Sequence, residues 1–144
     1  MKLKIVNISE NKLPKYETTG SSGLDLLTNN DEDIVLKSLE RTLVPTGLFV
    51  EIPKGFEGQV RARSGLSIKH GITLINGIGT IDSDYRGELK IPVVNLSTED
   101  FTIKKGLRIA QLVIIKHERV ELEEVKTLSD TSRGHGGFGS TGVN

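Results

Sequence analysis

Hydrophobic and polar residues alternate along much of this chain of 144 residues, a period-two pattern that is typical of half-buried β-strands. A denser apolar run from Ile109 to Ile115 indicates a strand that is buried on both faces. Helical periodicity is nearly absent, so the pattern predicts an all-β chain. The alternating runs contain Leu3 and Ile5; Ile34 and Leu36; Leu48, Val50 and Ile52; Val60 and Ala62; Leu89, Ile91 and Val93; Phe101 and Ile103; and Leu122.

Turn-forming residues separate the predicted strands. Many short strands with this spacing predict an antiparallel sandwich, jelly roll or barrel. One short helix is expected, with Ser64 as its N-cap, Leu66 and Ile68 inside it and Gly71 at its end. The turn sequences are Asn29-Asn30-Asp31, Pro45-Thr46-Gly47, Pro53-Lys54-Gly55, Tyr85-Arg86-Gly87 and Lys104-Lys105-Gly106.

Length and composition narrow the class of protein. The length suits one domain that buries about two-thirds of its unfolded surface. Lysine plus arginine (19) equal aspartate plus glutamate (19), so no overall field attracts the chain to nucleic acid or to a membrane. Cysteine is absent, which excludes disulfides and cysteine nucleophiles. Without a signal-like or membrane-spanning apolar run, we expect a cytoplasmic protein. Aromatic residues are only 4%, so we expect further burial at a subunit interface.

From about Thr127 onward the chain is rich in glycine and carries an arginine, an aromatic ring and hydroxyl groups. Such a segment cannot fold alone, because its glycines lose much backbone entropy and it has little to bury. Its N–H groups and the Arg133 guanidinium suit phosphate oxygens, and the Phe138 ring suits the face of a base. The segment is therefore either a flexible C-terminus or an arm that folds around a ligand.

Two polar segments in the middle of the chain carry candidate chemistry. Between Arg61 and Leu66, an arginine and the Ser64 hydroxyl meet free helix N–H groups, which together suit a phosphate. An ordinary capped helix with solvated arginines is the alternative. Further on, the Asn76 amide offers a donor and an acceptor to the edge of a base. Asp82 precedes a turn, where its carboxylate can deprotonate a water, although a polar hairpin tip has a similar composition.

Three familiar sites are excluded by spacing. Gly77-Ile78-Gly79 lacks the third glycine and the following helix of a dinucleotide fingerprint, and a P-loop sequence is absent. The histidines, His70, His117 and His135, lack the spacing of metal ligands.

Taken together, the segments resemble the homotrimeric deoxyuridine triphosphatases (dUTP diphosphatases, or dUTPases) over the full length of the chain. All five family motifs occur in order, and the third motif and the glycine-rich tail carry most of the specificity. Ser22 and Ala62 replace a common alanine and proline, and neither position supplies a functional group. The first four motifs match Gly23-Leu24-Asp25-Leu26, Arg63-Ser64-Gly65-Leu66-Ser67, the stretch from Gly79 to Glu88, and Arg108-Ile109-Ala110-Gln111-Leu112.

The resemblance implies a jelly-roll-like antiparallel β domain over residues 1–126. It also implies a flexible C-terminal arm over residues 127–144 that closes over the active site of a neighbouring subunit. The implied assembly is a homotrimer whose sites are shared between subunits. The implied reaction is Mg2+-assisted hydrolysis of dUTP to dUMP and diphosphate, which keeps uracil out of DNA and supplies dUMP for thymidylate synthesis.

The resemblance also assigns residue roles. Asp82 is the general base that activates the water attacking the α-phosphorus, and Asp25 binds waters around a Mg2+ that the triphosphate chelates. Tyr85 packs on the deoxyribose and excludes a ribose 2′-hydroxyl, while Arg63 orients Asp82 or the triphosphate. The remaining contacts are to the uracil from Asn76 and the backbone around Thr80 to Asp82, including Ile81, to phosphates from Ser64, Gly65 and Gln111, to the substrate from Gly79 and Lys90, and in the arm from Arg133, Phe138, Gly139, Ser140 and Thr141.

Two other functions remain open. A dCTP deaminase has a related fold and also handles a pyrimidine triphosphate, but it needs a glutamate acid/base in the pocket and has no use for a phenylalanine-bearing arm. Its product is ammonia rather than diphosphate. A trimeric β protein that binds nucleotide or a partner protein as a regulator is the non-enzymatic alternative, although Asp82 argues for a working site.

Overall fold

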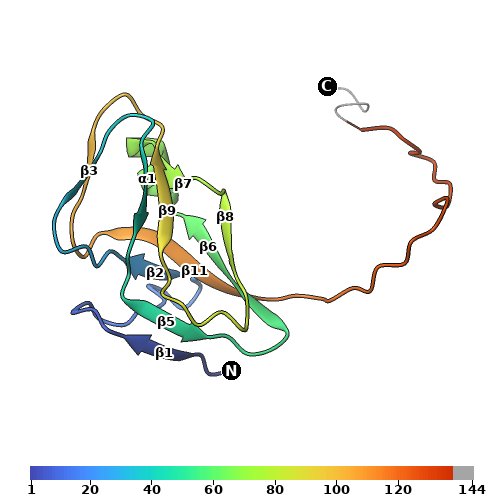
Figure 1. Cartoon of the computed structure of the whole chain (residues 1–144), viewed down its shortest axis with the longest axis horizontal. Helices are drawn as coiled ribbons and strands as arrows, with labels where there is room; N and C mark the ends of the chain where they lie inside the picture. Colours follow the sequence, from blue (N-terminus) through green and yellow to red (C-terminus); the bar gives the residue numbers. More distant parts are fainter. Residues whose placement is uncertain (138–144) are drawn as a thin grey trace.

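The computed structural model describes residues 1–137, which form a β body followed by a long C-terminal extension (Figure 1). The strands are β1 (Lys4–Asn7), β2 (Leu24–Leu27), β3 (Ile34–Leu36), β4 (Arg41–Val44), β5 (Leu48–Glu51), β6 (Phe56–Ala62), β7 (Ile72–Leu74), β8 (Ile78–Ile81), β9 (Ile91–Asn95), β10 (Phe101–Ile103) and β11 (Arg108–Lys116), and the helix is α1 (Ser64–His70). The predicted all-β architecture with one short helix is confirmed.

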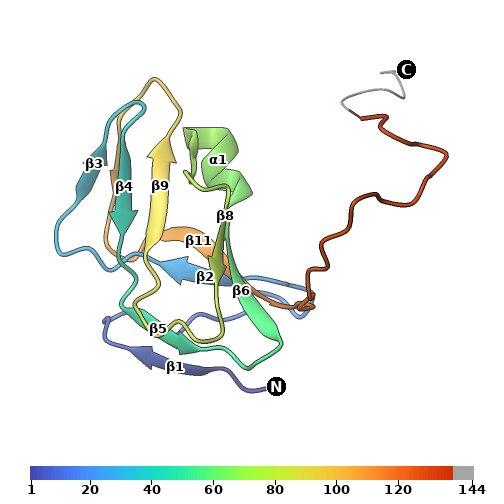
Figure 2. The ribbon, with the colours of Figure 1, turned by 45° about the vertical axis from the view of Figure 1, so that its right-hand side comes forward.

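The paired strands are antiparallel and form four sheets. The largest has the order β2-β11-β6-β8, so β2 and β8 are its edges. A second sheet has the order β4-β9-β7, and β1-β5 and β10-β3 are two-stranded. In Figure 2, β1 and β5 lie across one end of the body, and α1 lies beside the upper part of β9, toward the other end. Partners far apart in sequence, such as β2 and β11, show that the connections cross between sheets.

The core confirms the alternating pattern. In β5, Leu48 and Val50 are buried and Phe49 between them is half-buried. Leu26 from the largest sheet and Ile91 from the second sheet are fully buried and belong to the same core cluster. The buried hydrophobic residues of the described chain are all aliphatic. Packing therefore depends on branched side chains that interlock closely, and the burial expected at a subunit interface stays a prediction.

α1 begins differently from the prediction. Ser64 is not the N-cap, because Arg63 occupies that position with an extended backbone (φ −92°, ψ 123°) and makes no side-chain capping bond. The extended backbone of β6 thus continues through Arg63, and the Ser67 N–H donates to the Arg63 carbonyl at 3.0 Å. Gly71 ends the helix as predicted, in the left-handed region (φ 66°). Within residues 1–137, no helix has the length and apolar character needed to cross a membrane.

The chain leaves the β body after β11. From residue 117 to residue 137 it contains no helix or strand, and Figures 1 and 2 show it running away from the body. The strand predicted around Leu122 is therefore wrong, and this side chain is 90% exposed. The physical reason is that no described strand of the same chain pairs with this segment. The predicted boundary between residues 126 and 127 stays a prediction.

Gly71 provides a test of the packing beneath α1. A Cβ at this position would lie 2.7 Å from the Ser97 backbone nitrogen. We expect Gly71→Ala to lower the free energy of unfolding by roughly 2 kcal/mol or more, because left-handed strain and overpacking each cost on the order of 1–3 kcal/mol. Urea unfolding followed by circular dichroism measures the change. Gly55→Ala is the control, because Gly55 also has a positive φ (+82°) but has no atom within 4 Å of an added Cβ. Equal losses in the two variants would contradict the crowding at Gly71.

Candidate active site

The first group of predicted site residues gathers around the end of β8. A hollow of about 200 Å³ is lined by Thr80, Ile81, Asp82, Tyr85 and Lys90, together with Leu43 and Glu88. It combines an apolar wall with two carboxylates, an ammonium group and a phenol. The structure therefore brings together five residues that the third motif and the strand after it were predicted to contribute.

β8 is an edge strand that pairs only with β6 in its sheet, with Gly79 opposite Val60. An edge strand has a row of main-chain N–H and C=O groups on its outer side. Asn76 lies beside this strand, because a Cβ on Gly79 would be 3.5 Å from the Asn76 Nδ2 atom. The Asn76 carbonyl accepts a bond from the Ile78 N–H (2.8 Å), which closes the turn before β8. Rigid main-chain groups and one amide are thus available next to each other.

Asp82 begins the tight turn that follows β8. Its carbonyl accepts a hydrogen bond from the Tyr85 N–H (3.1 Å). The Arg86 guanidinium donates to the carbonyls of Ser83 (2.8 Å) and Tyr85 (2.9 Å). These bonds hold the backbone of the turn, while the Asp82 side chain is exposed and belongs to none of the ion pairs within residues 1–137. The carboxylate is therefore accessible to a water and to a ligand.

The second group lies where β2 meets β11. The Asp25 carboxylate holds two arginines, with Arg63 Nε 3.3 Å from Oδ1 and Arg108 Nη1 3.2 Å from Oδ2. Arg63 Nη1 also donates to the Arg108 carbonyl (3.0 Å). Gln111 stands opposite Asp25 in the ladder, and its Nε2 donates to the Ala62 carbonyl (3.2 Å). Two guanidiniums and one amide are thus held around a single carboxylate that is 17% exposed.

β6 separates the two groups. Ile81, next to Asp82, pairs with Gly58 near the start of β6, whereas Arg63 follows its other end. The extended backbone from Gly58 to Arg63 spans roughly 16 Å at about 3.3 Å per residue. In a single copy of the chain, the Arg63 guanidinium therefore contacts Asp25 and the Arg108 carbonyl rather than Asp82.

Three further predicted site residues, Ser64, Gly65 and Arg133, are on the surface. Ser64 and Gly65 are exposed at the start of α1, and no atom lies within 4 Å of a Cβ added to Gly65. Arg133 is on the C-terminal extension, where its Nε donates to the Gly136 carbonyl at 2.8 Å. The remaining predicted arm residues, Phe138, Gly139, Ser140 and Thr141, lie outside the described part of the chain.

Sequence reasoning missed two residues. Glu88, the last residue of the third motif, lines the hollow with Asp82. Arg108 opens the fourth motif and shares Asp25 with Arg63. Both residues belong to a family motif, and this membership was the only indication in the sequence that they contribute to the site. Their contacts were not predictable from local sequence, because each depends on a partner in a distant strand or turn.

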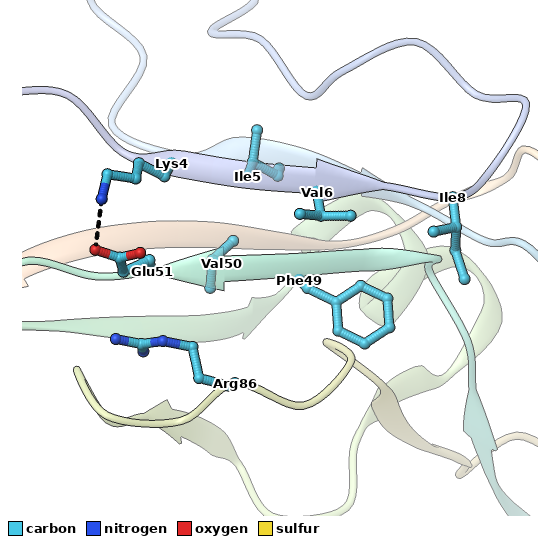
Figure 3. Close-up of a pocket in the computed structure, with 8 residues that line it drawn as sticks. All are labelled: Lys4, Ile5, Val6, Ile8, Phe49, Val50, Glu51 and Arg86. Atoms are coloured by element: carbon cyan, nitrogen blue, oxygen red, sulfur yellow. Dashed lines mark hydrogen bonds and ion pairs between the residues drawn. The ribbon is translucent and has the colours of Figure 1, made fainter.

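A larger hollow, of about 530 Å³, lies along β1 and β5, and none of the predicted site residues lines it. Figure 3 shows an apolar stretch that includes Val6, Ile8 and Phe49, with an ion pair at one end. There, Lys4 Nζ donates to Glu51 Oε1 at 2.9 Å. This hydrogen bond, together with the charge of Lys4, holds the pKa of the exposed Glu51 below its usual value. None of the residues that line this larger hollow lines the hollow at the end of β8, although Arg86 belongs to the turn that Asp82 begins.

Fold and site together define a class: a small antiparallel β protein that carries an exposed strand edge, an exposed turn carboxylate and a separate arginine cluster. The chain belongs to the dUTPase family, whose family model matches residues 9–142. The deoxyuridine 5'-triphosphate nucleotidohydrolase of Finegoldia magna is 63% identical over 142 residues, which are 99% of each chain. That of Fusobacterium nucleatum is 58% identical over 99% of this chain and 97% of its own.

Solved structures show the same similarity. The dUTPase of Staphylococcus bacteriophage 80alpha with dUpNHpp has a TM-score of 0.85 and 30% identity, and the alignment covers 99% of each chain. A variant dUTPase from phage phi11 of S. aureus, described with a structural Mg(II) ion, has a TM-score of 0.81 and 25% identity over 90% of this chain and 100% of its own. The predicted family, jelly-roll-like fold and enzyme class are confirmed.

Asp25 tests the arginine cluster. We expect Asp25→Asn to lower the free energy of unfolding by about 1–2 kcal/mol, because it removes the charge that holds two guanidiniums together at a largely buried position. Chemical unfolding of the purified variant provides the measurement. Glu10→Gln is the control. Glu10 also forms an ion pair, with Lys105 at 3.0 Å, but its side chain is 87% exposed, and we expect no measurable change in stability. An Asp25→Asn variant as stable as this control would show that the cluster adds nothing to the fold.

Proposed function

We propose that this chain hydrolyses dUTP to dUMP and diphosphate. One observation carries the proposal: the exposed Asp82 carboxylate is positioned by a tight turn at a hollow that Thr80 and Tyr85 also line. Membership of the dUTPase family and the phage relative's complex with dUpNHpp support the same substrate. The reaction would keep uracil out of DNA and supply dUMP for thymidylate synthesis. The cytoplasmic location stays a prediction.

In the proposed reaction, Asp82 is the general base. It takes a proton from a water whose oxygen forms a bond to the α-phosphorus. The bond from that phosphorus to the oxygen bridging to the β-phosphorus then breaks, and diphosphate leaves with the bonding electrons. The chain has no cysteine, and direct attack by water needs no covalent intermediate. The position of Asp82 between a hydrogen-bonded strand and a closed turn suits a base that must keep its geometry.

The edge of β8 is the proposed uracil site. Main-chain groups from Gly79 to Ile81, together with the Asn76 amide, distinguish uracil from cytosine by the order of donors and acceptors. A rigid strand also leaves no room for the methyl group of thymine, a difference of roughly 1–3 kcal/mol in a tight pocket. Tyr85 packs on the deoxyribose in this arrangement, and Lys90 lines the site.

The triphosphate is proposed to bind at the second group, where Arg63, Ser64, Gly65 and Gln111 supply donors. Positive charge must be local, because the chain has no net charge. The arm is proposed to complete the site with Arg133 on the γ-phosphate. It would also place Phe138 over the uracil and add Gly139, Ser140 and Thr141.

Magnesium fits this site as an ion carried by the substrate. Mg2+ usually keeps several waters and binds through one or two carboxylates plus substrate phosphates. No group of three or more histidine, aspartate or glutamate residues suited to a metal occurs within residues 1–137, whereas Asp25 offers a single carboxylate beside Gln111. Asp25 would hold waters of the bound ion. When bound, the ion neutralises part of the triphosphate charge.

A homotrimer with shared sites accounts for the separation of the two groups. The roughly 16 Å of backbone along β6 keeps Asp82 from the Arg63 cluster in one chain. A neighbouring copy can place its cluster against the hollow at β8, and a third copy can supply the arm. Figure 1 shows the extension after β11 running away from its own β body. In a trimer, this extension can bind to a neighbouring subunit.

Asp82→Asn tests the base. We expect the variant to fold and bind dUTP but to lose most of its turnover, on the order of a hundredfold or more, because an amide cannot accept the proton from water. Diphosphate and ammonia are assayed with dUTP, dCTP, dTTP and UTP. Asp84→Asn, two residues further along the turn, is the control and should remain active. Near-normal turnover by Asp82→Asn would eliminate this residue as the base, and ammonia from dCTP would indicate a deaminase instead.

Mixed trimers test the sharing of sites. We expect Asp82→Asn and a chain truncated before Arg133 to be inactive separately. After subunit exchange, activity should partly return, because some sites then combine an intact Asp82 with an intact arm from another chain. Light scattering of the wild type checks for a trimer. A monomeric mass, or no recovery after exchange shown by mass spectrometry, would contradict shared sites.

A further inference from the structure

Glu88 lines the hollow, yet the proposed reaction gives it no part. Its side chain and its carbonyl bind different segments of the chain. Glu88 Oε1 accepts hydrogen bonds from the N–H groups of Thr46 (3.1 Å) and Gly47 (2.8 Å), in the turn between β4 and β5. The Glu88 carbonyl accepts a bond from the Tyr85 hydroxyl (3.0 Å). Glu88 therefore connects the turn before β5 to the aromatic side chain at the hollow.

The backbone around Glu88 is also fixed to the body. Glu88 opposes Phe49 in an isolated β-bridge, and the next residue, Leu89, donates its N–H to the Leu48 carbonyl (2.8 Å). The Thr46 hydroxyl donates to the Leu89 carbonyl (2.6 Å). The Glu88 side chain is only 18% exposed, and hydrogen bonds to a charged acceptor are about twice as strong as neutral ones. The carbonyl that holds Tyr85 is thus itself held firmly.

Both Tyr85 and Lys90 contact Glu88, which restricts the positions of their side chains. A Cβ on Gly87 would collide with the Tyr85 ring and hydroxyl, so the end of the ring lies directly against Gly87. Lys90 Nζ is 3.6 Å from Glu88 Oε2. Glu88 therefore positions one aromatic and one cationic side chain at the hollow that Asp82 also lines.

We propose that Glu88 is a positioning residue that determines how strictly the site selects deoxyribose over ribose. The proposal rests on the proposed hydrolysis of dUTP, in which Tyr85 packs on the sugar. Excluding a single hydroxyl group requires a side chain that does not yield, and residues in contact with a ligand are kept in place by hydrogen bonds from the shell behind them. Glu88 provides that support through its carbonyl and through the turn that it anchors.

Kinetics with dUTP and UTP test the proposal. We expect Glu88→Ala to lower the dUTP-to-UTP ratio of kcat/KM about tenfold, with the larger change in the KM for dUTP, because one charge-assisted anchor is lost. Glu88→Gln should keep most of the selectivity, because its amide oxygen can still accept from Thr46 and Gly47. Tyr85→Phe should shift the ratio in the same direction as Glu88→Ala. Glu51→Ala is the control, because Glu51 pairs with Lys4 and does not line the hollow at the end of β8.

A second measurement does not depend on turnover. The chain has two tyrosines and no tryptophan, so in a Tyr16→Phe background the tyrosine fluorescence reports Tyr85 alone. We expect Glu88→Ala to lower the anisotropy of this fluorescence, and Glu88→Gln and Glu51→Ala to preserve it. This readout separates loss of positioning from a general loss of stability, which thermal unfolding measures for each variant.

Unchanged selectivity and anisotropy in a folded Glu88→Ala variant would overturn the proposal. If that variant does not fold, full selectivity in Tyr85→Phe would overturn it. A wild type that releases no diphosphate from dUTP would refute the proposed function, and the anisotropy would still show whether Glu88 anchors Tyr85.

Discussion

The pairing of β6 with β11 and β8 is the interaction on which the rest of the structure depends. β6 is bonded along its whole length to β11 and along four residues to β8. Gly58 leaves room for side chains that pack against this ladder, because a Cβ there would lie 2.9 Å from Ile52 Cδ1 and 3.0 Å from Leu112 Cδ1. The ladder sets the direction and the spacing of everything attached to it. The Asp82 carboxylate lies toward one end of β6, and an arginine cluster follows the other end.

Charge in this chain is organised locally. Two guanidiniums held close together repel each other, and the repulsion grows as water is excluded. Asp25 lies between Arg63 and Arg108 and balances part of their charge, so the cluster is assembled before any ligand arrives. The same carboxylate is thus a structural partner of the cationic groups and the proposed ligand for waters of a metal ion. A neutral overall composition is compatible with an anionic substrate because the positive charge is concentrated in this way.

The sequence predicted those features that depend on local patterns. Alternation identified strands such as β5, because one face of it is buried, and Gly71 identified the end of α1 through its left-handed backbone. Local patterns failed where the outcome depended on distant partners. The Arg108–Asp25 bond joins residues 83 positions apart, and nothing near either residue indicates the other. Leu122 has the alternation of a strand, yet alternation does not supply a partner strand.

The position of the candidate catalytic residue was predictable because a motif defined it, whereas its surroundings were not. Asp82 was expected at a turn, and the structure places it there. The support behind the turn involves Thr46 and Gly47, which belong to the connection between β4 and β5. Supporting contacts of this kind follow from the assembled topology, so a motif specifies the reacting groups more completely than the shell that orients them.

The exposed edge of β8 has a consequence for how this protein can change over evolutionary time. Main-chain N–H and C=O groups are present whichever side chain a residue carries, so most point mutations in β8 leave the pattern of donors and acceptors intact. Only a proline, which removes an N–H, or an insertion that shifts the register alters that pattern directly. Side-chain substitutions in this strand therefore preserve its main-chain donors and acceptors, and a different pattern of these groups requires a change in backbone geometry.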